Sequence, residues 1–166
     1  NEAAIQTLEK LLTEWPASAF TYEAMFVQGR AYVAAGKNGE AVRVFGDILD
    51  FADDDLLLNR ASLELGRAQT DPAEKLASFQ RVALLADPEK YADLIAEALT
   101  ESLPLYLELA RYDDLLADAD RLLEKFPNLG KTEEIDTLRA QAKQKLKELE
   151  KESISSNYHD RGNQMK

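Results

Sequence analysis

Apolar side chains recur every three or four residues along most of this chain, and short stretches with Gly, Pro or Asp interrupt them. Such spacing places the apolar positions on one face of an α-helix. We therefore predict an all-α protein made of successive amphipathic helices. The expected elements are a half repeat over 2–15, helix pairs over about 18–52, 54–86 and 88–126, and a last helix over 131–152.

The clearest pattern lies in the central stretch around Gly29. Gly29 is followed by Tyr32, and Ala41 is followed by Phe45. A small residue on each of two antiparallel helices lets their backbones approach closely, while aromatic rings fill the space beside them. Gly inside a helix costs about 1 kcal/mol relative to Ala, so Gly29 needs such a packing role. The Gly-Lys-Asn-Gly stretch at 36–39 is expected to form the turn.

The same spacing returns 37 residues away. Gly66 follows Gly29 by that distance, and four positions of the first helix match four of the central pair: Ala4, Leu8, Leu12 and Pro16 against Ala41, Phe45, Leu49 and Asp53. The first helix is therefore expected to be half of a pair. Its partner helix is expected to precede residue 1, which leaves the start of the array uncapped. We expect Trp15 to help cover this end.

The order G-x-x-Y followed by A-x-x-x-F resembles the tetratricopeptide repeat (TPR) family. The resemblance implies a right-handed α-solenoid of helix-turn-helix repeats with a C-terminal capping helix, and a function in protein binding. The lengthened gap between Pro16 and Gly29 resembles bacterial cell-envelope TPR proteins, such as the outer-membrane-assembly lipoprotein and the Tol-Pal-associated coordinator of cell division. This second resemblance implies a periplasmic or outer-membrane-associated location.

The second pair departs from the family pattern at two positions, and the third pair has a proline inside a helix. Gln69 and Lys75 stand where an aromatic and a small residue are expected, so we expect the helices of the second pair to be displaced relative to the first. Asp71 is expected to cap the second helix of that pair, with Pro72 in its first turn. Pro104 lies inside a helical pattern and is expected to kink or break it nearby.

The charge balance narrows the classes of partner. The chain has 31 acidic and 20 basic residues and a net charge of −11, which argues against binding nucleic acid. Because Cys is absent, disulfides and thiolate metal sites are excluded. No apolar run reaches the roughly 20 residues that span a bilayer, so we expect no direct membrane insertion of this segment. The start at Asn1 without a signal pattern suggests a processed piece of a longer chain.

The first helices of such repeats commonly line a concave surface on which partners bind. We predict a partner-binding surface on that face, made of Phe26, Arg30, Val33, Arg60, Leu63, Arg67 and Thr70. Arg30 and Arg67 occupy equivalent positions and are suited to hold a carboxylate of a peptide segment beside apolar side chains. The alternative is that both arginines form ordinary salt bridges to neighbouring acidic helices.

Other candidate sites are weaker. Family members that bind the C-terminal tails of chaperones use Lys and Asn to clamp the terminal carboxylate. This chain has Phe26, Leu63 and Thr100 where some of those residues would stand, so the carboxylate clamp is missing. The acidic run at 53–55 lacks the spacing of a calcium loop and is expected to cap a helix. His159 lies in a polar tail without the rigid neighbours that catalysis requires. We therefore predict no catalytic, cofactor or metal site, and no enzyme.

The last helix has an apolar stripe formed by Ile135, Leu138, Ala142, Leu146 and Leu149. It is expected to cap the array, with a polar flexible tail over 153–166. Occupation of the groove by this tail is the alternative. The favoured function is a non-enzymatic scaffold or adaptor that binds a peptide or protein segment on the concave face. The alternative is a structural assembly module that homo-oligomerises through its terminal helices, as a homodimer, within an envelope complex.

Overall fold

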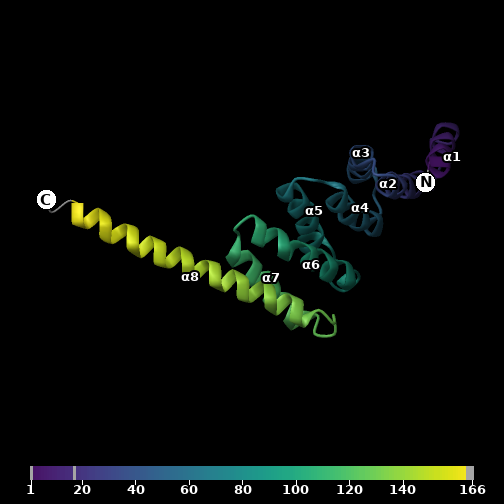
Figure 1. Cartoon of the computed structure of the whole chain (residues 1–166). Coiled ribbons are helices and arrows are strands. Elements are labelled where there is room, and N and C mark those ends of the chain that lie inside the picture. Colours follow the sequence, from purple (N-terminus) through teal and green to yellow (C-terminus); the bar gives the residue numbers. More distant parts are fainter. Residues whose placement is uncertain (1, 17, 164–166) are drawn as a thin grey trace.

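The described part of the chain consists of eight successive α-helices, shown in the computed structural model of Figure 1. The structure describes the backbone of residues 2–16 and 18–163 and the side chains of residues 2–16 and 18–153. The expectation of an all-α protein is confirmed. The helices are α1 (Glu2–Glu14), α2 (Thr21–Ala34), α3 (Asn38–Phe51), α4 (Asp55–Ala68), α5 (Pro72–Leu85), α6 (Ala92–Glu108), α7 (Tyr112–Lys125) and α8 (Thr132–Asn163).

Each helix packs against the next, and the array runs from α1 at one end to α8 at the other (Figure 1). In addition, α2 contacts α4, α4 contacts α6, and α6 contacts α8. We call these four helices the inner layer. Within the described residues the other four helices, the outer layer, make no such contacts with one another. A row of helices that touch on one side and separate on the other is concave on the touching side, so the inner layer lines the hollow face.

The core is spread along the array. One cluster of buried residues extends from Ile5 to Ala68, and a second extends from Leu63 to Ala142. Each helix packs its apolar stripe against its neighbours in the array, as expected for elements that cannot bury their apolar faces alone. The positions of the stripes therefore decide which faces remain open for other molecules.

Close helix contact at glycine recurs in the first two pairs. A Cβ atom added to Gly29 would lie 2.6 Å from Cε1 of Phe45, and one added to Gly66 would lie 2.7 Å from Cε1 of Phe79. Both phenylalanines are buried. The packing role predicted for Gly29 is confirmed, and the second pair repeats it.

The position at which the two helices of a pair cross in close contact nevertheless differs between the first and the second pair. Gly29 lies five residues before the end of α2, whereas Gly66 lies two residues before the end of α4. The two phenylalanines both lie seven residues after the start of their helices. The first helix of the second pair is thus displaced by about one turn. Gln69 ends α4 there and accepts a hydrogen bond from Ser78 at 2.8 Å.

The third pair has the opposite order of residue sizes at the corresponding positions. By the 37-residue spacing Leu103 corresponds to Gly29 and Gly66, and Ala119 corresponds to Phe45 at twice that distance. Leu103 is 1% exposed and Ala119 is 0% exposed, and both belong to the same core cluster. The large residue therefore lies on the first helix and the small one on the second.

The turns of the first and third pairs share one backbone conformation. Gly36 has φ 73° and Ala110, 74 residues later, has φ 56°. The residue after each donates its backbone N–H to a tyrosine carbonyl, at 2.9 Å in the first pair and 2.8 Å in the third. These bonds satisfy carbonyls at the helix end. Asn38 and Gly39, expected in the turn, begin α3 instead.

Ala110 occupies a left-handed conformation that costs a non-glycine residue about 1 kcal/mol. We expect Ala110→Gly to raise the free energy of unfolding by about 0.5 to 1 kcal/mol, because part of the relief is offset by the greater freedom of Gly in the unfolded chain. Gly36→Ala at the matched position should lower it by about 1 kcal/mol. Urea unfolding measures the free energy of both variants. Two changes of the same sign would contradict the interpretation that the two turns share one backbone conformation.

Two expectations about local structure were wrong, and a third was wrong in part. Pro104 does not break α6, which is continuous from Ala92 to Glu108. The kink expected near Pro104 stays a prediction. Trp15, which follows the last turn of α1, is 66% exposed, so it is not packed over the end of the array as expected. The last helix continues to Asn163 rather than ending at 152, since no Gly or Pro interrupts residues 131–161.

Candidate functional site

The predicted concave surface lies on α2 and α4 of the inner layer, but two of its apolar members are not accessible. Phe26 and Leu63 are each 3% exposed. The Phe26 ring packs at 5.8 Å from that of Phe45, and the guanidinium of Arg60 covers it at 4.4 Å. Their role as open apolar anchors is therefore corrected: both belong to the core, because neighbouring helices enclose them.

Arg67 is the centre of a carboxylate cluster between α4 and α6. Its guanidinium donates to Glu64 at 3.2 Å, to Glu101 at 3.1 Å, and to Glu97. Burial lowers the pKa of Arg67, but hydrogen bonds to Glu97 and Glu101 raise it further, so its pKa lies above the ordinary arginine value. The salt-bridge alternative thus holds for Arg67, because both terminal nitrogens of its guanidinium already donate to carboxylates of this chain.

Arg30 has a different environment although it occupies the equivalent position. Its side chain is exposed, and no ion pair of Arg30 is found within the part of the chain that the structure describes. The reason lies on α4: where α6 offers Glu97 and Glu101 to Arg67, α4 offers Arg60 and Glu64, 37 residues earlier. Arg60 carries the same charge as Arg30 and lies over the Phe26 ring, and Glu64 is bonded to Arg67. Arg30 is therefore available to an external carboxylate.

Beside the cluster, the surface is hollowed between α4, α5 and α6. This hollow measures about 350 Å³ and is lined by Gly66, Arg67, Lys75, Phe79, Glu101, Pro104 and Leu105. The apolar part of its lining includes Phe79 and Leu105, and Lys75 adds a second positive charge beside that of Arg67. Sequence reasoning missed Lys75 as a site residue, although a lysine in place of a small residue was a visible signal. Of the remaining predicted residues, Val33 is half-buried and Thr70 is exposed.

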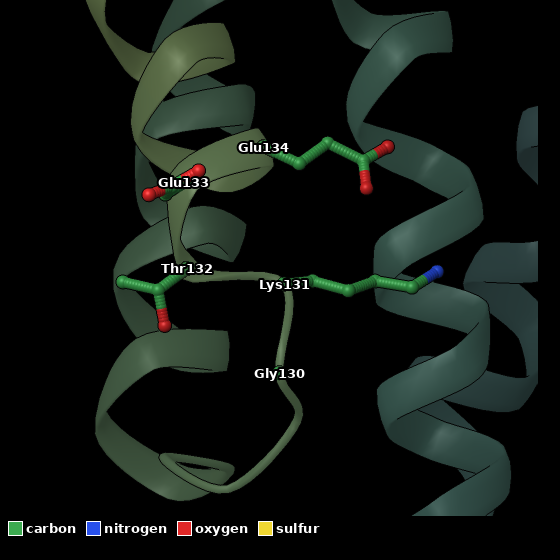
Figure 2. A pocket seen from close by; sticks show the side chains of 5 residues that line it. All are labelled: Gly130, Lys131, Thr132, Glu133 and Glu134. Carbon is green, nitrogen blue, oxygen red and sulfur yellow. The ribbon is translucent and has the colours of Figure 1, made fainter.

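Another hollow lies at the start of α8 and measures about 490 Å³. It is formed by consecutive residues 130–134. Figure 2 shows that Lys131 and Glu134 extend toward one side, while Glu133 lies apart from them. Because the polar groups do not converge, this hollow has no feature of a binding site.

The acidic residues in the inter-helix turns act locally. Asp54 accepts a hydrogen bond from the backbone of Leu57 at 2.7 Å, which confirms the capping role expected for the 53–55 run. Asp71 accepts from Ala73 and Glu74 in the same way, so its predicted cap is also confirmed. Among the described residues, no group of three or more His, Cys, Asp or Glu is arranged to hold a metal ion.

None of the described helices is both long enough and apolar enough to cross a membrane. Comparisons with protein-family models, with curated proteins and with solved structures gave no match.

Proposed function

We propose that this chain is a non-enzymatic protein-binding scaffold, built as a right-handed, TPR-like solenoid. Its inner layer binds an extended protein or peptide segment that carries a carboxylate next to apolar side chains. The resemblance of the Gly29 to Phe45 stretch to the family, and the recurrence of close glycine–phenylalanine contacts, support the class of fold.

The binding proposal rests on one observation: of two arginines at equivalent positions, one is bonded to carboxylates of this chain and the other is not. Arg67 is engaged with three carboxylates of this chain, which shows what the position binds when acidic groups are within reach. Arg30 is exposed, and α4 carries Arg60 at the position that corresponds to Glu97 of α6. A ligand carboxylate at Arg30 would reproduce the bonds of Arg67, and Val33, one turn later on α2, supplies apolar surface beside it.

We expect peptides selected on this protein from a random displayed library to be enriched in Asp or Glu beside apolar residues. Arg30→Glu should weaken the binding of the selected peptides by about tenfold or more, because like charges replace a charge-assisted bond. Isothermal titration of the purified peptides measures the change.

Arg43→Glu provides the matched control, since Arg43 is an exposed arginine on α3 in the outer layer. It should leave affinity unchanged. Selected peptides that bind Arg30→Glu as tightly as the parent chain, or that lose affinity equally with Arg43→Glu, would remove Arg30 from the site.

A further inference from the structure

Four exposed large apolar side chains belong to the edge of the array at which the α3–α4 and α5–α6 turns lie. Phe51 ends α3 and is 70% exposed, and Leu84 and Leu85 end α5 and are 70% and 72% exposed. Leu56, in the first turn of α4, is 44% exposed. Helices joined by short turns run in opposite directions, so these two turns lie on the same edge. We call residues 51–56 and 84–91 the turn edge.

Two of these side chains occupy equivalent positions. Phe51 and Leu85 each lie 13 residues after the start of their helix and are 34 residues apart, as Phe45 and Phe79 are. In α7 the same position is Lys125, which is also exposed. The fold therefore does not require an apolar residue there. Single exposed apolar residues are common, but several on one edge indicate a contact surface.

The turn edge also contains a hollow of about 150 Å³, between the start of α4, the end of α5 and the turn before α6. It is lined by Asp55, Leu58, Asn59, Arg81, Leu85, Asp87 and Tyr91. Asn59 and Tyr91 are half-buried, and among the described residues neither side chain forms a hydrogen bond. Unused polar groups beside the apolar walls of Leu58 and Leu85 are suited to one long polar side chain of a ligand.

The charge around this hollow is negative. Residues 44–59 contain five acidic residues and no basic residue. The α5–α6 turn adds Asp87, whose ion pair with the exposed Lys90 is long, at 3.6 Å. Arg81 is exposed, and the described part of the chain shows no ion pair for it. Carboxylates thus outnumber cations at the turn edge, which favours a ligand of positive charge.

We propose that the turn edge binds a basic segment of a partner protein and places one Arg or Lys side chain of that segment in the hollow. The aliphatic stem of this side chain lies against Leu58 and Leu85, while its cationic head meets Asp55 and Asp87. The head also donates to the two unused polar groups. Apolar residues next to it in the segment cover the exposed side chains of the turn edge.

The position of the turn edge in the array distinguishes it from the open ends. Both turns lie between helices that already pack on each other (Figure 1). Further repeats at either end would stack on α1 or α8 and leave this edge open. The turn edge is also separate from the inner-layer site at Arg30, which takes a carboxylate. A test of one surface is therefore independent of the other, and Arg30→Glu should leave binding at the turn edge unchanged.

The probes are peptides selected on the full chain from a random displayed library, with removal of those that also bind Leu85→Ser. We expect the remaining peptides to be enriched in Arg or Lys beside Leu, Ile or Phe. Asp55→Lys and Phe51→Ser should each weaken their binding about tenfold or more, measured by fluorescence anisotropy. Affinity should also fall as ionic strength rises. Failure to recover any peptide that distinguishes Leu85→Ser from the parent chain would overturn the proposal.

Two matched variants separate the turn edge from general attraction to an acidic protein. Asp113→Lys makes the same charge change in the first turn of α7, and Leu149→Ser removes an apolar side chain on α8 that is 51% exposed. Both should leave affinity unchanged, and an equal loss with Asp113→Lys would overturn the proposal.

Two other occupants of the turn edge have distinct results. A dimer seen by light scattering that Leu85→Ser dissociates would assign the edge to a second copy of this chain. Co-sedimentation with zwitterionic lipid vesicles that is lost with Leu85→Ser would assign it to a membrane surface. Either result would overturn the assignment to a basic partner segment.

Discussion

Gly29→Ala is expected to lower the free energy of unfolding by about 1 to 3 kcal/mol, although Ala is the better helix former. The new methyl group would lie 2.6 Å from the Phe45 ring, closer than two carbon atoms can approach. Phe45 is 0% exposed and packs beside Phe26, so its ring cannot move aside without disturbing the core. Urea unfolding followed by circular dichroism measures the loss.

Gly46→Ala is the matched control for this substitution. Gly46 also lies in the interior of a helix of the first pair, but a Cβ atom there would meet nothing within 4 Å. The change should stabilise the protein by up to about 1 kcal/mol through helix propensity alone. If the free energy of unfolding falls with Gly29→Ala and rises with Gly46→Ala, close packing rather than the conformational freedom of glycine explains the glycine at position 29. A stabilising effect at both positions would contradict this account.

Local patterns were sufficient to predict the helices and the contact at Gly29. Apolar spacing and the turn residues act over a few positions, so they are readable without knowledge of distant segments. The same is true of Asp71, whose cap bonds reach only two and three residues along the chain. The end of α8 was misjudged because polar composition was taken to indicate flexibility, whereas a polar helix without Gly or Pro can continue past its packed part.

The candidate site was less predictable because its state depends on distant residues. Arg67 is engaged by Glu97 and Glu101, which lie 30 and 34 residues away. Only the packing of α6 against α4 brings those carboxylates to it. The ring of Phe26 is likewise covered by Arg60 and Phe45, which lie on other helices. The repeat spacing correctly paired Arg30 with Arg67, but it could not distinguish an engaged arginine from an available one.

The third pair tests the hypothesis that one large and one small residue are required where the two helices of a pair cross. Leu103→Gly should lower the free energy of unfolding by about 3 to 5 kcal/mol, because it leaves a cavity and a flexible backbone. Ala119→Phe should lower it by about 1 to 3 kcal/mol or more through overpacking. Both sites are buried in the same core cluster.

Together these two substitutions convert the third pair to the arrangement of the first, with Gly on the first helix and Phe on the second. The double variant should therefore be more stable than the sum of the single losses predicts, by at least about 1 kcal/mol of coupling. Ile95→Gly combined with Ala119→Phe serves as the control, because Ile95 is equally buried on α6 but lies two turns before Leu103. That combination should be additive. Additive losses with Leu103→Gly would mean that Leu103 and Ala119 do not face each other as Gly29 and Phe45 do.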